Sequence, residues 1–193
     1  TRVNHLAHLF LAGDSPESLL GNLAGDFVKG VLDGRFPPEV ERGIREHRRI
    51  DAFTDSHPEV AGFRRVIAAD HGHYSRVIGD IFLDHFLARE WAAFSSETLE
   101  SFLQRTWSRL DVLIDRMPGH LRIVYPMMRD GEWLPSYASI DGIWTALFHL
   151  SRRFSRQPRL EFATHLLIDS REVLQERFHH FMPEVIDFAK GLR

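Results

Sequence analysis

Apolar residues recur at the three- and four-residue spacing of an α-helix along almost the whole chain. No segment alternates strictly between apolar and polar residues, as a half-buried strand would. Asp14 followed by Glu17 resembles a capping box and predicts the start of a first helix. We expect that helix to reach about Val31 and to end at Asp33-Gly34.

Proline, glycine and serine residues divide the rest of the chain into further helical segments. We expect these segments at about 37–55, 58–67, 73–91, 95–115, 118–126 and 139–150, then as a long helix to about 181 and a short one after Pro183. The stretch 131–136 has the most loop-like composition. The pattern predicts an all-α bundle of about seven to nine helices. A chain of 193 residues with 44% hydrophobic content suits a single domain, residues 1–193.

Composition excludes several classes of protein. The formal net charge of -3 argues against a general nucleic-acid binder, which needs a strongly basic face. The chain has no cysteine, so disulfides, thiolate metal sites and cysteine nucleophiles are excluded. No apolar run approaches the roughly 18 residues of a membrane span, and residues 1–5 do not begin a secretory signal. These features fit a cytoplasmic protein that binds no membrane.

Polar residues lie on the apolar face of the helix expected at 37–55. Val40, Ile44, His47 and Asp51 fall on one stripe, so the imidazole and the carboxylate should point toward the core, one turn apart. A buried carboxylate is costly unless it is paired or binds a metal. For this pair alone, a hydrogen bond inside the core is the simpler interpretation.

The helices expected at 73–91 and 16–31 also carry polar residues on or beside their apolar faces. His85 lies on the same inward face as Ile81, and Asp84 lies on its flank, one turn after Asp80. Two carboxylates at that spacing repel unless a cation neutralises them, although Asp80 is more simply a solvated residue at the edge of the stripe. Asp26 lies at the rim of the first apolar stripe.

A further polar residue, His8, lies among apolar residues near the start of the chain. A lone histidine in that setting is more often a core residue than a ligand. Together, however, the candidates come from several helices and share one character. A set of imidazoles and carboxylates without thiolates suits Mn²⁺, Mg²⁺ or Fe²⁺, and Zn²⁺ less strictly. We therefore predict a common metal site from His8, Asp26, His47, Asp51, Asp84 and His85.

Arginines next to these residues predict a phosphate site. Arg48 and Arg49 follow His47 directly, and a guanidinium can hold phosphate oxygens with two hydrogen bonds. Most of the chain's arginines are more simply solvated surface charges, and such charges also suit an acidic protein partner. No glycine-rich phosphate loop or serine nucleophile elbow occurs in the sequence.

These motifs resemble the bacterial acyl carrier protein phosphodiesterases. The resemblance rests on Asn-His-Leu-Ala-His-Leu at 4–9, Gly-Asn-Leu-Ala-Gly-Asp-Phe-Val-Lys-Gly at 21–30, His-Arg-Arg-Ile-Asp at 47–51 with Thr54-Asp55, Asp-His-Phe-Leu at 84–87 and Ser-Arg-Arg at 151–153. It extends through nearly the whole chain and is strongest in the first 90 residues. His5 replaces an aromatic residue of the family's opening motif.

The resemblance implies a reaction, a cofactor and a partner. The family hydrolyses holo-acyl carrier protein to the apo form and 4′-phosphopantetheine, with Mn²⁺ favoured over Mg²⁺ or another divalent cation. It is regarded as an unusual relative of the all-helical His-Asp phosphohydrolases, so the fold is expected to be like theirs. In those relatives a histidine precedes an adjacent aspartate, whereas here Asp84 precedes His85.

We expect Asp26, His47 and Asp84 to hold the metal, with His85 as a further candidate. Asp51 would orient His47 or bind the metal itself, and His8 would bind the metal or assist proton transfer. Arg48 or Arg49 would stabilise charge on the phosphate.

Two alternatives stay open from the sequence. One is a metal-dependent phosphohydrolase of a small nucleotide. The other is a helical module that binds the carrier protein without catalysis. The oligomeric state does not follow from the sequence.

Overall fold

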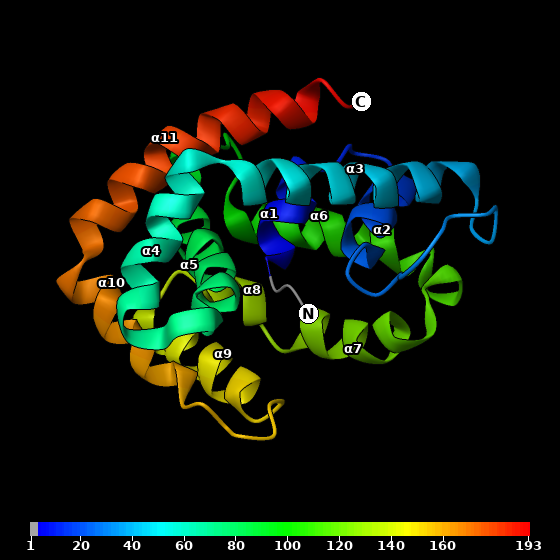
Figure 1. Ribbon diagram of the computed structural model, residues 1–193. Helices are drawn as coiled ribbons and strands as arrows, with labels where there is room; N and C mark the ends of the chain where they lie inside the picture. Colours follow the sequence, from blue (N-terminus) through cyan, green and yellow to red (C-terminus); the bar gives the residue numbers. More distant parts are fainter. Residues whose placement is uncertain (1–3) are drawn as a thin grey trace.

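The computed structural model describes residues 4–193, and within that range it contains helices and no strand (Figure 1). The all-α prediction is confirmed, while the likeness to His-Asp phosphohydrolases and the single domain stay predictions. The helices are α1 (His5–Leu11), α2 (Pro16–Ala24), α3 (Pro38–Ser56), α4 (Pro58–His71), α5 (Ser75–Arg89), α6 (Leu99–Asp111), α7 (Gly119–Asp130), α8 (Trp133–Ser136), α9 (Ile140–Ser151), α10 (Leu166–Asp169) and α11 (Arg171–Lys190). Short 3₁₀ segments lie at Gly72–Tyr74, Trp91–Ala93, Ile114–Arg116 and Leu160–His165. None of the helices in residues 4–193 combines the length and the apolar character that crossing a membrane requires.

The first predicted helix is shorter than expected. It stops at Ala24 instead of Val31, because the amides of Phe27 and Val28 both bond to the Ala24 carbonyl in a turn. Gly30 then takes a left-handed backbone conformation with φ of 80°. Asp26 therefore lies on a turn after α2, which lets its side chain leave the direction of the helix.

Three smaller predictions were wrong. Ser15, not Asp14, caps α2 by accepting from the Ser18 amide, and Asp14 pairs with Arg105 instead. The loop expected at 131–136 contains the short helix α8. The break expected at Pro183 does not occur, because α11 continues through it to Lys190. A proline inside a helix removes one backbone hydrogen bond, and here the packing of α11 against α3, α4 and α5 offsets that loss.

Helix α3 crosses the upper part of the molecule in Figure 1, below the C-terminal part of α11 and with α1 and α2 beneath it. Helix α2 packs along α3, and α1 packs against α2, α5 and α11. The α2–α3 contact is made by two glycines: a Cβ on Gly21 would come within 2.7 Å of the Gly43 Cα and would overlap the Val40 carbonyl. This close approach brings the C-terminal turn of α2 against the middle of α3, where His47 lies.

Gly21→Ala should destabilise the protein by about 1–3 kcal/mol, because the added methyl meets backbone atoms that cannot rotate away. Gly119→Ala is the matched control, since nothing lies within 4 Å of its added Cβ at the start of α7. The control should change stability by less than about 0.5 kcal/mol. Denaturant unfolding followed by circular dichroism measures both. Equal stability of the two variants would contradict a close α2–α3 crossing.

Candidate functional site

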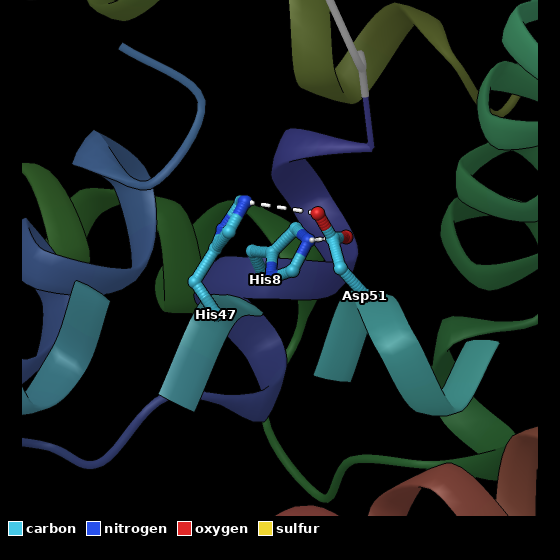
Figure 2. Close-up of side chains that lie close together, drawn as sticks. All are labelled: His8, His47 and Asp51. Carbon is cyan, nitrogen blue, oxygen red and sulfur yellow. Dashed lines mark hydrogen bonds and ion pairs between the residues drawn. The ribbon is translucent and has the colours of Figure 1, made fainter. Parts of the chain in front are cut away.

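Three predicted residues converge on one point between α1 and α3. Figure 2 shows His8 from α1 facing His47 and Asp51 from α3. Each offers one donor atom, and these atoms all lie within 4.8 Å of one another. The Asp51 carboxylate bridges the two rings, with Oδ1 3.2 Å from Nε2 of His8 and Oδ2 3.4 Å from Nε2 of His47. The imidazoles stack with centroids 3.7 Å apart. The structure thus brings together residues separated by 43 positions.

Asp26 adds a second carboxylate to this cluster from the turn after α2. Its Oδ1 lies 3.7 Å from Nε2 of His47, on the same ring nitrogen that faces Asp51. Its Oδ2 is buried and has no hydrogen-bond partner among residues 4–193. A buried carboxylate oxygen without a partner is costly, and a cation would satisfy it. We call His8, Asp26, His47 and Asp51 the His-Asp cluster.

Contacts with Asn22 and Gly25 fix the orientation of the His47 ring. Its Nδ1 lies 2.8 Å from the Asn22 carbonyl and must donate to it, because a carbonyl oxygen only accepts. Gly25 packs directly on the ring, and any Cβ there would overlap it. Nε2 is thereby turned toward Asp26 and Asp51. A histidine whose Nδ1 donates to a backbone carbonyl presents Nε2 for metal binding in many proteins.

Burial and proximity shift the protonation of the cluster. Burial alone would lower the pKa of His47, but the adjacent Asp26 and Asp51 raise it to about 9. Burial would raise the pKa of Asp51, but hydrogen bonds from His47 and His8 hold it well below its usual range. Burial and the neighbouring His47 lower the pKa of His8 to about 4. Without a cation, one proton on His47 thus balances part of the carboxylate charge.

A cleft of about 410 Å³ opens onto the His-Asp cluster. It is lined by Gly25, Asp26, Val28, Lys29, Gly30, His47, Arg48 and Asp51. Arg48 donates to the Val28 carbonyl at 3.1 Å, which holds its guanidinium at the wall of the cleft. Arg49 is exposed and does not line the cleft. A second cleft, of about 490 Å³ around His57 and Glu184, contains none of the predicted site residues.

Asp84 and His85 do not join the cluster in this structure. Asp84 is fully buried and accepts from the amides of Leu6 and Ala7 at 3.0 and 2.9 Å, which are otherwise unpaired in the first turn of α1. Burial raises the pKa of Asp84 well above its usual range, against the opposing effect of these two amides. His85 donates from Nδ1 to the Tyr137 carbonyl at 2.7 Å. That Asp84 and His85 bind a metal stays a prediction from the sequence.

Sequence reasoning missed the residues that position the cluster. The Asn22 carbonyl and Gly25 orient His47, and Lys29 adds a positive charge to the cleft. The glycines of α2 were visible as an excess in a helical segment, but nothing local indicated which side chain they would contact. The sequence placed Asp84 on the flank of an inward helix face, yet its role at the start of α1 depends on the packing of α1 against α5.

Comparisons with known proteins agree on one family. Residues 3–185 match the family described as "Acyl carrier protein phosphodiesterase". A protein of that name from Yersinia pestis is 34% identical over 189 residues, covering 97% of this chain and 98% of that protein. Proteins of the same name from Serratia proteamaculans and Salmonella agona are 33% and 32% identical, over 97% and 95% of this chain and 98% and 96% of their own. No solved structure matches the chain.

The metal-free protein should be most stable near pH 6.5. Because the pKa of His47 is raised to about 9 from 6.5, its stabilising contribution is complete below pH 6.5 and is lost as the pH rises to about 9. The pKa values of His5 and His8, lowered mainly by burial to about 4, act in the opposite sense. Their contribution is complete above pH 6.5 and is lost as the pH falls toward 4.

Denaturant midpoints measured across this pH range, with a chelator present, test the prediction. His47→Gln should abolish the alkaline loss of stability and retain the acidic one. The same alkaline slope in both proteins would rule out His47 as its source.

Proposed function

The chain belongs to the acyl carrier protein phosphodiesterase family, and on that premise we propose that it hydrolyses holo-acyl carrier protein with the aid of a divalent cation. The bond cleaved is the phosphodiester between 4′-phosphopantetheine and a serine, and the products are apo-acyl carrier protein and 4′-phosphopantetheine. The observation that carries the cation is the His-Asp cluster. Donor atoms of His8, His47 and Asp51 lie within 4.8 Å of one another, Asp26 lies 3.7 Å from His47, and the cluster opens to a cleft.

The donor set suits Mn²⁺. Two imidazole nitrogens and two carboxylates form a mixed nitrogen and oxygen set without thiolate, and Mn²⁺ accepts both kinds of donor more readily than Mg²⁺ does. His8, Asp26, His47 and Asp51 would hold the ion, and the unpartnered Oδ2 of Asp26 would gain a partner. When bound, such an ion would supply Lewis acidity, which lowers the pKa of water and polarises phosphoryl oxygens.

The protein's own residues provide binding and orientation. Arg48 lines the same cleft as the cluster, and its bond to the Val28 carbonyl leaves other guanidinium hydrogens to meet an anion. Lys29 also lines the cleft, and because it is exposed it can contact a phosphodiester that enters from solvent. These two charges would hold the non-bridging oxygens and compensate the charge that develops on them.

The cleft is also open enough for a macromolecular substrate. Its lining includes the exposed residues Lys29 and Gly30, on the loop that joins α2 to α3. Arg49 is exposed on α3 next to Arg48 and has no carboxylate partner among residues 4–193. A carrier protein that presents acidic groups around its phosphopantetheinylated serine would be attracted to this side.

Mass spectrometry of holo-acyl carrier protein after incubation with the enzyme and Mn²⁺ tests the proposal. Loss of the mass of the prosthetic arm, dependent on the enzyme and abolished by a chelator, is the expected result. His47→Ala and Asp26→Ala should each slow this loss by at least about 100-fold, because each removes a donor to the ion while the helices persist. Wild-type turnover that a chelator leaves unchanged would contradict the role of the ion. A complex that forms without any release would instead identify a binding module, and turnover of free nucleotides a different substrate.

Arg48 and Arg49 form a matched pair of variants on one helix. Arg48→Ala should lower kcat by about 100-fold, the usual effect of removing a donor that stabilises developing charge. Arg49→Ala removes the same charge outside the cleft and should change kcat by less than about threefold while raising KM. Steady-state kinetics against holo-acyl carrier protein separates the two. Equal effects on kcat would remove Arg48 from the phosphate site.

A further inference from the structure

The side chain of Asn4 does not perform the role that its position suggests. Asparagine is a favoured residue at a helix N-cap, where its oxygen usually accepts from the second or third helical amide. Asn4 occupies the N-cap of α1 but makes no such bond. Asp84 already takes both of those amides, from Leu6 and Ala7. Oδ1 of Asn4 is instead buried, and it has no hydrogen-bond partner among residues 4–193.

The second unpartnered atom is Nδ1 of His8. The ring is only 1% exposed; its Nε2 faces Asp51, while its Nδ1 is buried without a partner among the same residues. A buried polar atom in a native structure is nearly always paired, with protein or with an ordered water. Two such atoms on neighbouring turns of one short helix require a common explanation.

Both residues line one small cavity behind α1. The cavity measures about 20 Å³, and most of its wall is apolar, from α3, α5 and α11. Thr54 supplies a third polar group to the wall; its hydroxyl donates to the Ile50 carbonyl at 2.8 Å, so its lone pairs can still accept. A buried water needs roughly 10–15 Å³ and two to four polar partners. The cavity behind α1 is large enough for one water, and three of its lining residues, Asn4, His8 and Thr54, carry polar groups.

We propose that one ordered water occupies this cavity and joins Nδ1 of His8 to Oδ1 of Asn4, so that Asn4 is a positioning residue for the His-Asp cluster. A water can donate two hydrogen bonds and accept two, so it serves either tautomer of His8. Through the water, Asn4 holds the His8 ring with Nε2 toward Asp51. The water is inferred from the cavity and the two unpartnered atoms alone, whereas the positioning role rests on the divalent cation of the proposed function.

A high-resolution crystal structure of the metal-free protein tests the water directly. Density for one water within hydrogen-bonding distance of both atoms is expected in the wild type. It should persist in Asn4→Asp, which keeps an acceptor oxygen in place, and disappear in Asn4→Leu. Thr106→Val is the control, because it removes a fully buried, unpartnered hydroxyl on α6 that lines neither the cavity nor the cleft. No water in the wild type, or an unchanged water in Asn4→Leu, would overturn the proposal.

The positioning role has a separate readout. Binding of Mn²⁺, measured by calorimetry, should weaken by about 10-fold in Asn4→Leu, as for other groups that orient a ligating histidine. Asn4→Asp and Thr106→Val should stay within about threefold of the wild type. Equal affinity in Asn4→Leu and wild type would reject the positioning role. A wild type that binds no Mn²⁺ would count against the proposed function, while the water would still be decided by the crystal structure. Should Asn4→Leu fail to fold, the wild-type density alone supports or rejects the water.

Discussion

The site depends on one hydrogen bond, from Nδ1 of His47 to the Asn22 carbonyl. It turns Nε2 of His47 toward both carboxylates and sets the ring against Gly25. The bond exists only because α2 approaches α3 at the distance that two facing glycines permit. A larger residue at that crossing would move the Asn22 carbonyl away from the ring. The packing of two helices thus determines the direction of a single side-chain nitrogen.

Burying two imidazoles and two carboxylates together needs compensation for the water they lose. The cluster itself supplies part of this compensation, because Asp51 bonds to both rings and a proton on His47 balances charge. Two atoms of the cluster receive none: Oδ2 of Asp26 and Nδ1 of His8 have no hydrogen-bond partner among residues 4–193. These two atoms point to different partners. Asp26 lines the cleft, where we propose a cation, and His8 lines an almost apolar cavity, where we propose a water.

Asp84 makes contacts that the sequence did not predict. Its position one turn after Asp80, on the flank of an inward face, suggested a metal ligand, because two carboxylates at that spacing repel unless a cation neutralises them. The partners that the structure provides are two amides at the start of α1. Asp84 therefore anchors the helix that carries His8, and it leaves the side chain of Asn4 without its usual capping role. A residue outside the His-Asp cluster thus determines where one member of it lies.

Local periodicity was sufficient for the helical class, for the inward direction of His47 and Asp51, and, through short motifs, for the family. These properties depend on residues within one or two turns of each other, where helix geometry is constant. The structure alone decided that His8 meets Asp51, that Asp26 reaches His47 from a turn, and that Arg48 rather than Arg49 lines the cleft. Each of these depends on how separate helices pack, because contacts between distant residues follow from the shapes of the buried faces, which no local pattern encodes.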